Sequence, residues 1–238
     1  MKDHLDELKQ LEHRYATKPA RPRLITAGRN AWARWRARTS GGSKRALDIT
    51  VAATALGVFL PFGLIIAALI RRDGGPVFYW QDRVGYRGRR FRFPKFRSMV
   101  VNAEQLREAL LQVNDHAGSG ITFKSENDPR ITSIGRFLRR SSLDEIPQLW
   151  SVLKGDMSLV GPRPALPDEV DRYTPLQRRR LEAKPGLTCI WQVSGRSQIP
   201  FEGQVALDLE YIRTRSFRGD LVLLLKTVPA VLFARGAS

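Results

Sequence analysis

The chain has 238 residues, with 40 Lys and Arg against 23 Asp and Glu and a formal charge of +17. Such an excess of positive charge indicates an anionic partner: a nucleic acid, a nucleotide or an acidic lipid surface. The single cysteine, Cys189, excludes an intrachain disulfide and, with only three histidines, argues against a zinc site. Any metal is therefore expected to be a hard cation bound by oxygen atoms.

Residues 1–43 are predicted to form an extension with amphipathic and interfacial helices. Acidic residues are mixed into its start and no apolar core follows them, which argues against a secretory signal. Leucines recur there at helical spacing, which predicts a helix that packs or self-associates, so a homodimer is one interpretation. Trp32 and Trp35 alternate with arginines, a pattern typical of a helix at the headgroup level of a membrane. The segment SGGS at 40–43 predicts a flexible joint.

Residues 44–72 are predicted to enter a membrane. The run Ile49–Ile70 has no charged residue, and its 22 residues would cover roughly 33 Å as a helix, enough for a bilayer core. Basic residues flank it on both sides, whereas a spanning helix has that bias on one side only. Pro61, near its middle, predicts a sharp break. The sequence favours a re-entrant helix–break–helix with both ends on the cytoplasmic face; a kinked span and a buried core helix are the alternatives.

Residues 73–238 are predicted to form a domain on the cytoplasmic face, so the fold class is α+β and mostly helical. Apolar residues at 77–79 and 91–93 flank Gly-Tyr-Arg-Gly, which predicts a short β-hairpin. Two short helices are expected on either side of Ser141 and Ser142. Thr174, followed by a proline, predicts the start of a further helix. The apolar C-terminal tail is expected to lie against the membrane or the core.

Two neighbouring acids, Asp144 and Glu145, stand in the segment RRSSLDEIPQLW. Ser142 and Glu145 match a capping box, but a helix starting there would put Pro147 in its interior, where the missing N–H breaks a hydrogen bond. If Asp144 is the N-cap, Pro147 falls in the first turn and costs nothing, so the proline predicts a helix start at Asp144. The helix end and the preceding arginines should favour the ionised form of Asp144. Structural capping and a role as phosphorus nucleophile or Mg²⁺ ligand are both compatible with this pattern.

Five stretches, in order along the chain, carry a resemblance: KRALDIT, GPVFYWQDRVGYRGRRFRFPKFRSM, SSLDEIPQLWSVLKGDMSLVGPRP, KPGLTCIWQVSGRS and LDLEYI. Together with what lies between them they cover roughly four-fifths of the chain, and five motifs in register are far more specific than one. The sequence thereby resembles the bacterial sugar transferase family, the monotopic phosphoglycosyl transferases that begin the assembly of surface polysaccharides and glycoconjugates.

The resemblance implies an activity. A sugar 1-phosphate would pass from a UDP-sugar to polyprenol (undecaprenyl) phosphate through an aspartyl-phosphosugar intermediate, with release of UMP and with Mg²⁺ present. Asp144 and Glu145 would be the catalytic dyad and would hold the metal. The break in the membrane segment would lie near Pro61, and the enzyme would sit in the bacterial inner membrane with its site on the cytoplasmic face, among anionic lipids. No nucleic-acid partner is expected.

Basic residues in the matching motifs or directly before one are candidates for holding phosphates, because guanidinium and ammonium groups pair with them. These are Lys95, Arg97, Arg140, Arg163 and Arg196. Asp156 is either a further metal-site acid or a turn residue. Asp48, at the mouth of the membrane segment, is expected to pair with Arg45 or a helix end, or else to stay solvated.

Two other functions are compatible with part of the sequence. A basic membrane-associated scaffold or nucleic-acid-binding protein would explain the charge but not the acids placed among arginines. A glycosyl transferase that moves only the sugar would release UDP instead of UMP. No motif in the sequence indicates which sugar is transferred.

Overall fold

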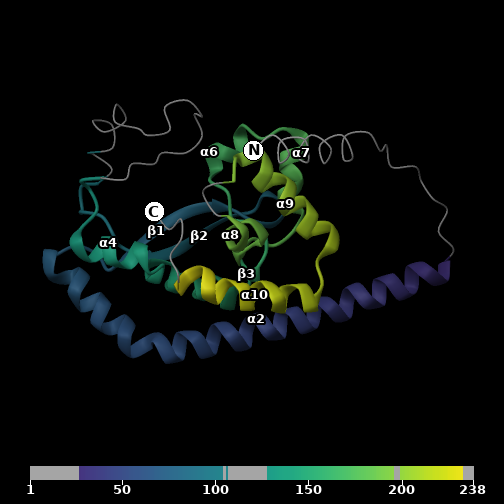
Figure 1. Ribbon diagram of the computed structural model, residues 1–238, viewed down its shortest axis with the longest axis horizontal. Helices are drawn as coiled ribbons and strands as arrows, with labels where there is room; N and C mark the ends of the chain where they lie inside the picture. The colour runs from purple at the N-terminus through teal and green to yellow at the C-terminus, as the bar shows by residue number, and fades with distance from the viewer. Residues whose placement is uncertain (1–26, 104–105, 107–127, 196–198, 233–238) are drawn as a thin grey trace.

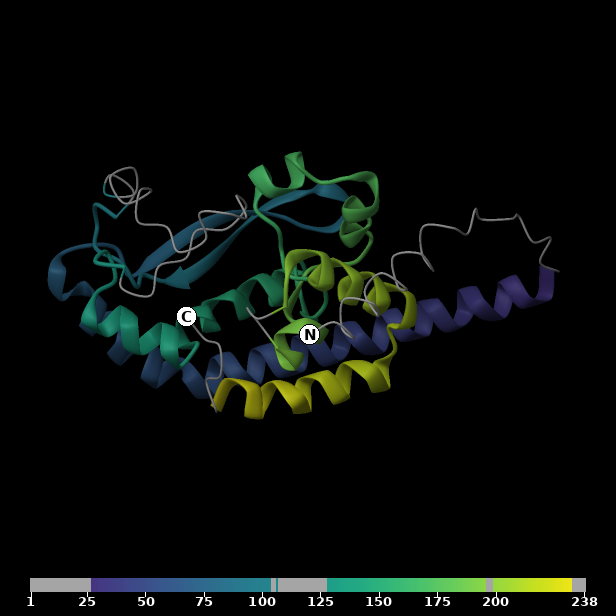
Figure 2. The same ribbon diagram turned by 45° about the horizontal axis from the view of Figure 1, so that its top comes forward.

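The computed structural model describes residues 27–103, 106, 128–195 and 199–232; for residues 27–40 and 230–232 it describes only the helical backbone. The described part of the chain is mostly helical and contains two small sheets of two strands each. Figures 1 and 2 show the other elements gathered on one side of a long helix, α2 (Ala27–Ile70), with α10 (Phe217–Leu232) running beside it. The predicted mostly helical α+β class with a hairpin is thus found.

Helix α2 continues through Pro61 and bends along its length (Figure 1). Pro61 therefore does not separate two helices: the chain bends instead, as helices in an apolar environment can. The predicted joint at 40–43 is also wrong, since these residues lie inside α2. Exposed glycines cost a helix only about 1 kcal/mol each, which the neighbouring turns can offset. Among the described residues, one stretch, Gly41–Asp73, is long and apolar enough to cross a membrane.

The start of the apolar part of α2 is bonded to distant segments. Lys44 Nζ donates to Asp220 Oδ2 at 2.6 Å and to the carbonyl oxygen of Val160 at 3.0 Å. Tyr211 donates its hydroxyl to Asp220 Oδ1 and also contacts the Val160 carbonyl. Because Asp220 is 2 % exposed, this is a buried ion pair between α2 and α10.

The next residues of α2, Arg45 and Asp48, bond the helix to two more elements. Arg45 donates to two carbonyl oxygens in the last turn of α5 (Leu149–Lys154), at 2.6 and 2.7 Å. Asp48 is buried and accepts hydrogen bonds from Ser158 Oγ and from the backbone N–H of Leu159. Asp48 is therefore neither solvated nor paired with Arg45; it anchors the start of β3 (Ser158–Val160).

The far end of α2 is held by Arg97. Its guanidinium bonds both carboxylate oxygens of Asp73 and the carbonyl oxygen of Ile70, and its Nε donates to the carbonyl of Pro76. Arg97 is 7 % exposed. The predicted phosphate role of Arg97 is not supported by this geometry, because its donors are already used to anchor the chain that leaves the membrane segment. The same contact holds the pKa of Asp73 at about 2.

The two ends of the apolar run pack on the rest of the protein, while most of the large side chains in its middle are exposed. Ala52, Ile66 and Ile70 are buried in the two main apolar clusters. Between them, the side chains on either side of Pro61 are about 60–69 % exposed: Val58, Leu60, Phe62, Leu64 and Ile65. The interpretation of this run as a buried core helix is therefore wrong.

The predicted hairpin is present: β1 (Phe78–Val84) and β2 (Arg90–Phe96) pair antiparallel around the 3-10 turn η2 (Tyr86–Gly88). A second, parallel pair, which the sequence did not suggest, joins β3 to β4 (Gly186–Thr188). Ser158 lies opposite Gly186 and Val160 opposite Thr188. This pair brings two segments nearly thirty residues apart into one layer above α2.

Short helices complete the domain. The expected division near Ser141 is confirmed, with α4 (Ser133–Arg140) before it. The expected cap is confirmed as well: Thr174 Oγ1 accepts the N–H of Gln177 at the start of α7. The remaining elements are η1 (Arg71–Asp73), η4 (Leu143–Gln148), α6 (Pro167–Asp171), α7 (Pro175–Arg178), η5 (Arg179–Glu182), α8 (Ile190–Ser194) and α9 (Phe201–Thr214).

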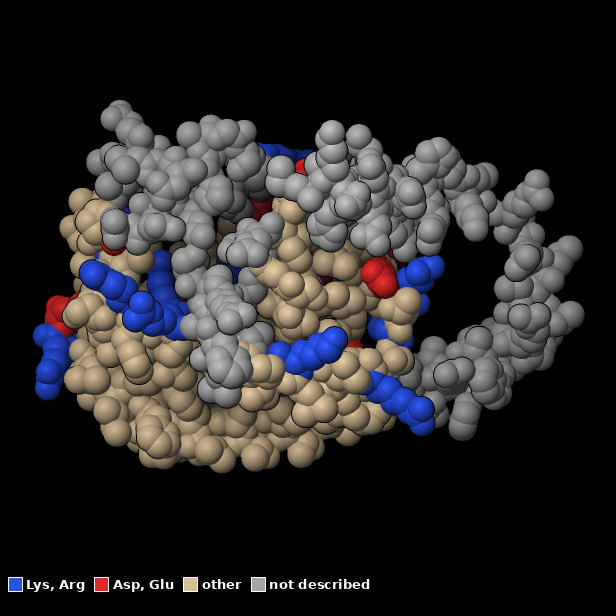
Figure 3. Space-filling model, in the orientation of Figure 1, with Lys and Arg blue, Asp and Glu red and all other residues tan. Residues whose placement is uncertain are grey.

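One surface of the molecule is apolar. Along α10 the side chains of Leu221, Val222, Leu225 and Val228 are exposed, beside the exposed middle of α2. Trp150 on α5 is exposed too, at 52 %. The space-filling view shows a broad band along the lower edge without charged side chains, and most Lys and Arg side chains of that face lie above it (Figure 3). This arrangement is compatible with monotopic insertion into a membrane.

Candidate active site

The two neighbouring acids lie in η4, directly after the turn that ends α4. Ser142 enters this turn with φ of 56°, a left-handed conformation that a non-glycine residue adopts at a cost of about 1–2 kcal/mol. Its side chain makes no capping bond, and η4 begins at Leu143. The predicted helix start at Asp144 is therefore wrong, and the capping box does not form. The reversed chain at Ser142 sets η4 against α4 instead of extending it.

Asp144 is a buried acid, 8 % exposed. Burial is the largest influence on its pKa and raises it to about 6; Glu145 adds to this, while the charges of Lys95 and Arg139 oppose it. The expectation that its surroundings would favour ionisation is thus wrong in sign, because desolvation outweighs the nearby cations. At neutral pH the carboxylate is still mostly ionised, but weakly solvated, which suits a nucleophile.

Glu145 has the opposite electrostatics. Burial alone would raise its pKa, but the charges of Lys95 and Arg163 outweigh burial and lower the pKa to about 2. Lys95 Nζ lies 2.7 Å from Glu145 Oε1 and 5.8 Å from the centre of the Phe93 ring. Two adjacent carboxyls therefore differ in pKa by about 4, so only Asp144 can exchange a proton near neutral pH.

Arg139, and not the predicted Arg140, faces the acid. The Arg139 charge lowers the pKa of Asp144, and its Nε donates to Ser98 Oγ at 2.9 Å. Arg140 is exposed and makes no hydrogen bond or ion pair within the described residues. Consecutive side chains on a helix point about 100° apart, so only one of the two arginines can face η4.

The position of Arg139 depends on a close approach between α4 and the end of β2. A Cβ atom at Gly135 would collide with the backbone of Ser98. The Ser98 carbonyl accepts the N–H of Thr132, whose own hydroxyl caps α4 by accepting the N–H of Gly135. Only glycine at this position lets α4 lie on Ser98 and bring Arg139 to the acid.

Arg163 lies in the loop that follows β3. A Cβ atom at Gly161 or Gly186 would collide with the facing backbone, so two glycines let the loop leave the β3–β4 pair at close range. The Arg163 side chain is exposed, and within the described residues it makes no hydrogen bond or ion pair. Its charge acts on Glu145, so Arg163 stands beside the dyad with its donors open.

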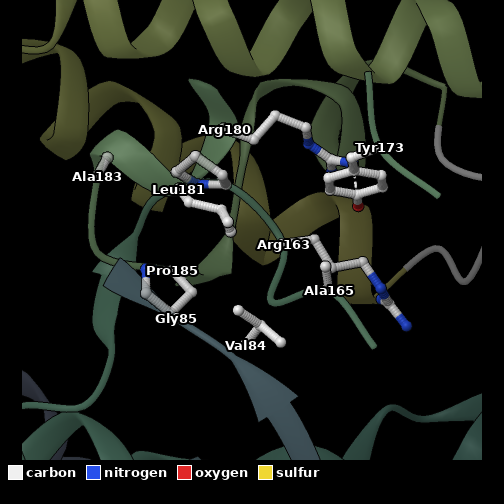
Figure 4. Close-up of a pocket in the computed structure, with 10 residues that line it drawn as sticks. Val84, Gly85, Arg163, Ala165, Tyr173, Arg180, Leu181, Ala183 and Pro185 are labelled. Atoms are coloured by element: carbon white, nitrogen blue, oxygen red, sulfur yellow. Dashed lines mark hydrogen bonds between the residues drawn. The ribbon is translucent and has the colours of Figure 1, made fainter. Parts of the chain in front are cut away.

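The enclosed hollow behind this loop is not a binding site. Its volume is about 10 Å³, room for at most one water molecule. Figure 4 shows Tyr173 and Arg180 packed side by side across it, while the guanidinium of Arg163 points away from the hollow. The guanidinium of Arg163 is therefore not used in lining this hollow and points outward.

Arg83 was not predicted, yet it lies next to these groups. It is 6 % exposed, lies 5.3 Å from the centre of the Phe93 ring, and donates to the carbonyl of Pro164 and to Gln81 Oε1. Its Nε is buried without a partner, and no carboxylate within the described residues pairs with it. Burial and the Arg163 charge lower the pKa of Arg83 to about 10. A buried, uncompensated guanidinium is costly, and its position next to Arg163 points to an anion.

The chain matches the bacterial sugar transferase family over residues 39–234. It belongs to that family. It is 49 % identical over 196 residues to the galactosyl transferase CpsE of Streptococcus agalactiae, covering 82 % of this chain and 43 % of the relative. It is 42 % identical over 200 residues to the exopolysaccharide production protein ExoY of Rhizobium meliloti, covering 83 % and 88 %. It is 44 % identical over 203 residues to the undecaprenyl-phosphate galactose phosphotransferase of Salmonella typhimurium, covering 84 % and 42 %.

These sugar transferases differ in length. The chain spans less than half of CpsE and of the Salmonella phosphotransferase, but most of ExoY. The shared part contains both acids, Lys95 and Arg163, so the site described above lies within the family's common region.

The side chains of the site could hold Mg²⁺ only together with a bound substrate. Within the described residues no three His, Cys, Asp or Glu side chains gather as a complete metal site. Mg²⁺, however, is commonly held by one or two carboxylates together with substrate phosphates and water. Asp144 and Glu145 can supply the two carboxylates, and a bound diphosphate can supply the rest.

The structure shows the surroundings of two of the remaining candidate residues, Asp156 and Cys189. Asp156 pairs with Lys154 at 3.1 Å, after the end of α5, as expected of a turn residue. Cys189 is fully buried and its pKa is raised by burial, so it is packed and not reactive. Arg196 lies outside the described residues, as does the leucine-rich start of the chain.

Proposed function

We propose that this sugar transferase moves a sugar 1-phosphate from a UDP-sugar to polyprenol phosphate, the first membrane step of polysaccharide or glycoconjugate assembly. The observation that carries the proposal is the unequal acid pair: a buried Asp144 with its pKa raised to about 6, next to a Glu145 bonded to Lys95. Two relatives are named undecaprenyl-phosphate phosphotransferases, one for galactose and one for N-acetylgalactosamine, which supports the acceptor class.

The reaction proceeds in two displacements. A carboxylate oxygen of Asp144 forms a bond to the β-phosphorus of the donor, the bond to the bridging oxygen breaks, and UMP leaves. A phosphate oxygen of the acceptor then attacks the same phosphorus and releases the Asp144 carboxylate. Over the two displacements one phosphoanhydride replaces another, so the overall transfer needs no energy source. Two steps let one carboxylate serve a soluble donor and a membrane-bound acceptor in turn.

The other residues bind and orient. Glu145 stays ionised because Lys95 holds it, so it serves as a fixed anion and not as a proton carrier. Arg163 and Arg139 flank the dyad as cations for the donor phosphates. Asp144 and Glu145 would hold Mg²⁺, which when bound offsets negative charge between the diphosphate and the attacking carboxylate.

The same proposal places α2 in the cytoplasmic leaflet of the inner membrane as a re-entrant helix. Its two flanks, at Lys44 and at Asp73, bond to the same domain, which supports their lying on one side of the bilayer. Its exposed middle around Pro61 would dip into the lipid together with the apolar side of α10. Basic residues around the band would contact anionic headgroups.

A labelling experiment tests this topology. Gly42→Cys and Arg72→Cys lie on exposed positions at the two flanks, and Phe62→Cys lies at the bend. In right-side-out cells, an impermeant thiol reagent should react with neither flank, and both should react after the inner face is opened. Phe62→Cys should stay protected in either case. A flank labelled from outside would replace the re-entrant helix with a span; the buried Cys189 keeps the background low.

Replacing Arg83 tests whether its charge serves the donor. Arg83→Met removes a buried cation without a counter-ion, so folding stability should stay equal or rise while the KM for the donor rises about tenfold, with kcat changed less. Arg83→Lys keeps the charge and should recover part of the affinity. If both variants kept the wild-type KM for the donor and melted at a lower temperature than wild type, Arg83 would have only a structural role.

The central experiment is product analysis with a panel of UDP-sugars and undecaprenyl phosphate. Release of UMP shows that the sugar 1-phosphate moves, and release of one equivalent of UMP without the acceptor supports the two-step transfer. Release of UDP would show that only the sugar moves. Retention of DNA without nucleotide release from any donor would favour the basic binding protein instead.

A further inference from the structure

An open hollow of about 660 Å³ lies between the hairpin and the end of α5, and half of the residues that line it are cationic. We call it the hairpin groove. Its lining consists of Trp80, Arg89, Arg90, Phe91, Arg92, Lys154, Gly155 and Asp156. None of these residues takes part in the dyad described above.

Two cations of the hairpin groove, Arg90 and Arg92, lie on the face of β2 opposite to Lys95, which bonds Glu145, because side chains alternate along a strand. In the antiparallel register Arg92 lies opposite Asp82, on the same face as Trp80. Phe91, which also lines the groove, lies on the face of Lys95, so the groove is at the edge between the two faces. None of its cations is among those that flank Asp144 and Glu145.

Charge in the hairpin groove is not balanced. Arg89 and Arg90 are exposed, and their side chains make no hydrogen bond or ion pair within the described part of the chain. Arg92 reaches only Asp82, at 3.4 Å, with both side chains about two-thirds exposed. Lys154 has Asp156 at 3.1 Å. Four cations thus meet two carboxylates, and the surplus suits a phosphate group.

The floor of the groove touches the start of the apolar segment. A Cβ atom at Gly155 would lie 3.4 Å from Arg45 Nη2 and 3.7 Å from Lys184 Nζ, so two more cations stand behind it. Arg45 precedes the uncharged run by only a few residues, which sets the groove at the level where α2 would enter the lipid. Trp80, 46 % exposed beside arginines, has the character of a headgroup-level aromatic.

We propose that the hairpin groove binds the phosphate group of a membrane lipid. The lipid is either an anionic phospholipid or polyprenol phosphate waiting to react, since both present a phosphate at this height. The inference rests on the membrane placement proposed above, and not on the transfer reaction.

The test compares two double variants with the same loss of charge. Arg89→Gln/Arg90→Gln removes the two unpaired cations of the groove. Arg178→Gln/Arg179→Gln removes two exposed cations from α7 and η5 and serves as the control. Each full-length protein is placed in neutral phosphatidylcholine nanodiscs that also contain either phosphatidylglycerol or undecaprenyl phosphate. Lipids that stay bound on release from the disc are counted by native mass spectrometry, and melting temperatures check the fold.

Retention of at least one of the two phosphate lipids should fall threefold or more in the groove variant and stay unchanged in the control. The lipid that is lost identifies the source of the phosphate. An equal fall in both variants would reduce the effect to general charge, and no fall in either would overturn the site. UMP release, measured on the same samples, reports separately on the transfer proposal.

Discussion

Asp144→Asn is expected to abolish sugar-phosphate transfer and, at the same time, to stabilise the folded protein. The amide cannot attack phosphorus, so turnover should fall at least about a thousandfold, the order of loss seen when a nucleophile is removed. Asparagine has nearly the same shape but no charge to bury. The variant should therefore fold and fractionate with membranes, and residual activity above that level would remove Asp144 from the nucleophile's role.

The sign of the stability change follows from the pKa of Asp144, about 6 in the folded protein against an ordinary value of 3.8. The folded state binds this proton more tightly, so ionisation disfavours folding above pH 6 and the penalty vanishes as pH falls below about 4. Two pKa units correspond to about 3 kcal/mol at most. In metal-free buffer, Asp144→Asn should melt higher than wild type at pH 7–8, with the difference closing toward pH 4.

Glu145→Gln is the matched control, because its pKa is displaced in the other direction, to about 2 from 4.5. The ionised form is favoured by folding, so this stability is present above about pH 4.5 and is lost as pH falls toward 2. The glutamine variant should melt lower than wild type at neutral pH, since Lys95 loses its partner. A shift of both variants in the same direction would contradict the proposed division between the acids.

The second large effect is expected at Asp208→Ala. Asp208 lies 2.6 Å from Arg180 Nη2, and the two side chains are 1 % and 6 % exposed. Arg180 also contacts the Tyr173 hydroxyl and the rings of Tyr173 and Phe201, so it ties η5 to α9. Removing the acid leaves a buried guanidinium without a counter-ion, which should lower the free energy of unfolding by about 3–5 kcal/mol.

The neighbouring pair provides the comparison. Arg179 and Glu182 are 3.4 Å apart and more than half exposed, so Glu182→Ala should change stability by less than about 1 kcal/mol. Urea unfolding of the two variants measures both values. Similar losses at Asp208 and Glu182 would mean that the buried pair is not ionised in the folded protein.

The sequence predicted those features of the fold that depend on local pattern. The hairpin, the division at Ser141 and the cap at Thr174 each follow from turn or capping residues within a few positions. Of the residues predicted for the site, Asp144, Glu145, Lys95 and Arg163 lie close together in the structure, and the sequence alone did not show this proximity.

The errors came from contacts between distant segments. The choice of Arg140 over Arg139 needed the direction in which α4 faces η4, which depends on the left-handed Ser142. Arg97 was predicted to bind phosphate because its partner, Asp73, is separated from it in the sequence by the whole hairpin. Arg83 gave no signal, since a buried cation cannot be told from a surface one by its neighbours in the chain. The sign of the Asp144 shift depended on burial, which no motif reports.

The bonds of Lys44 have a further consequence for the geometry of catalysis. One ammonium group joins the base of the apolar helix to α10 and to the carbonyl of Val160, three residues before Arg163. In the proposed mechanism, the distance between the Asp144 carboxylate and the lipid surface would then be fixed by the protein's own covalent and hydrogen-bonded framework. A thicker or thinner bilayer would tilt or reposition the whole molecule, but the reach from acceptor phosphate to Asp144 would stay the same.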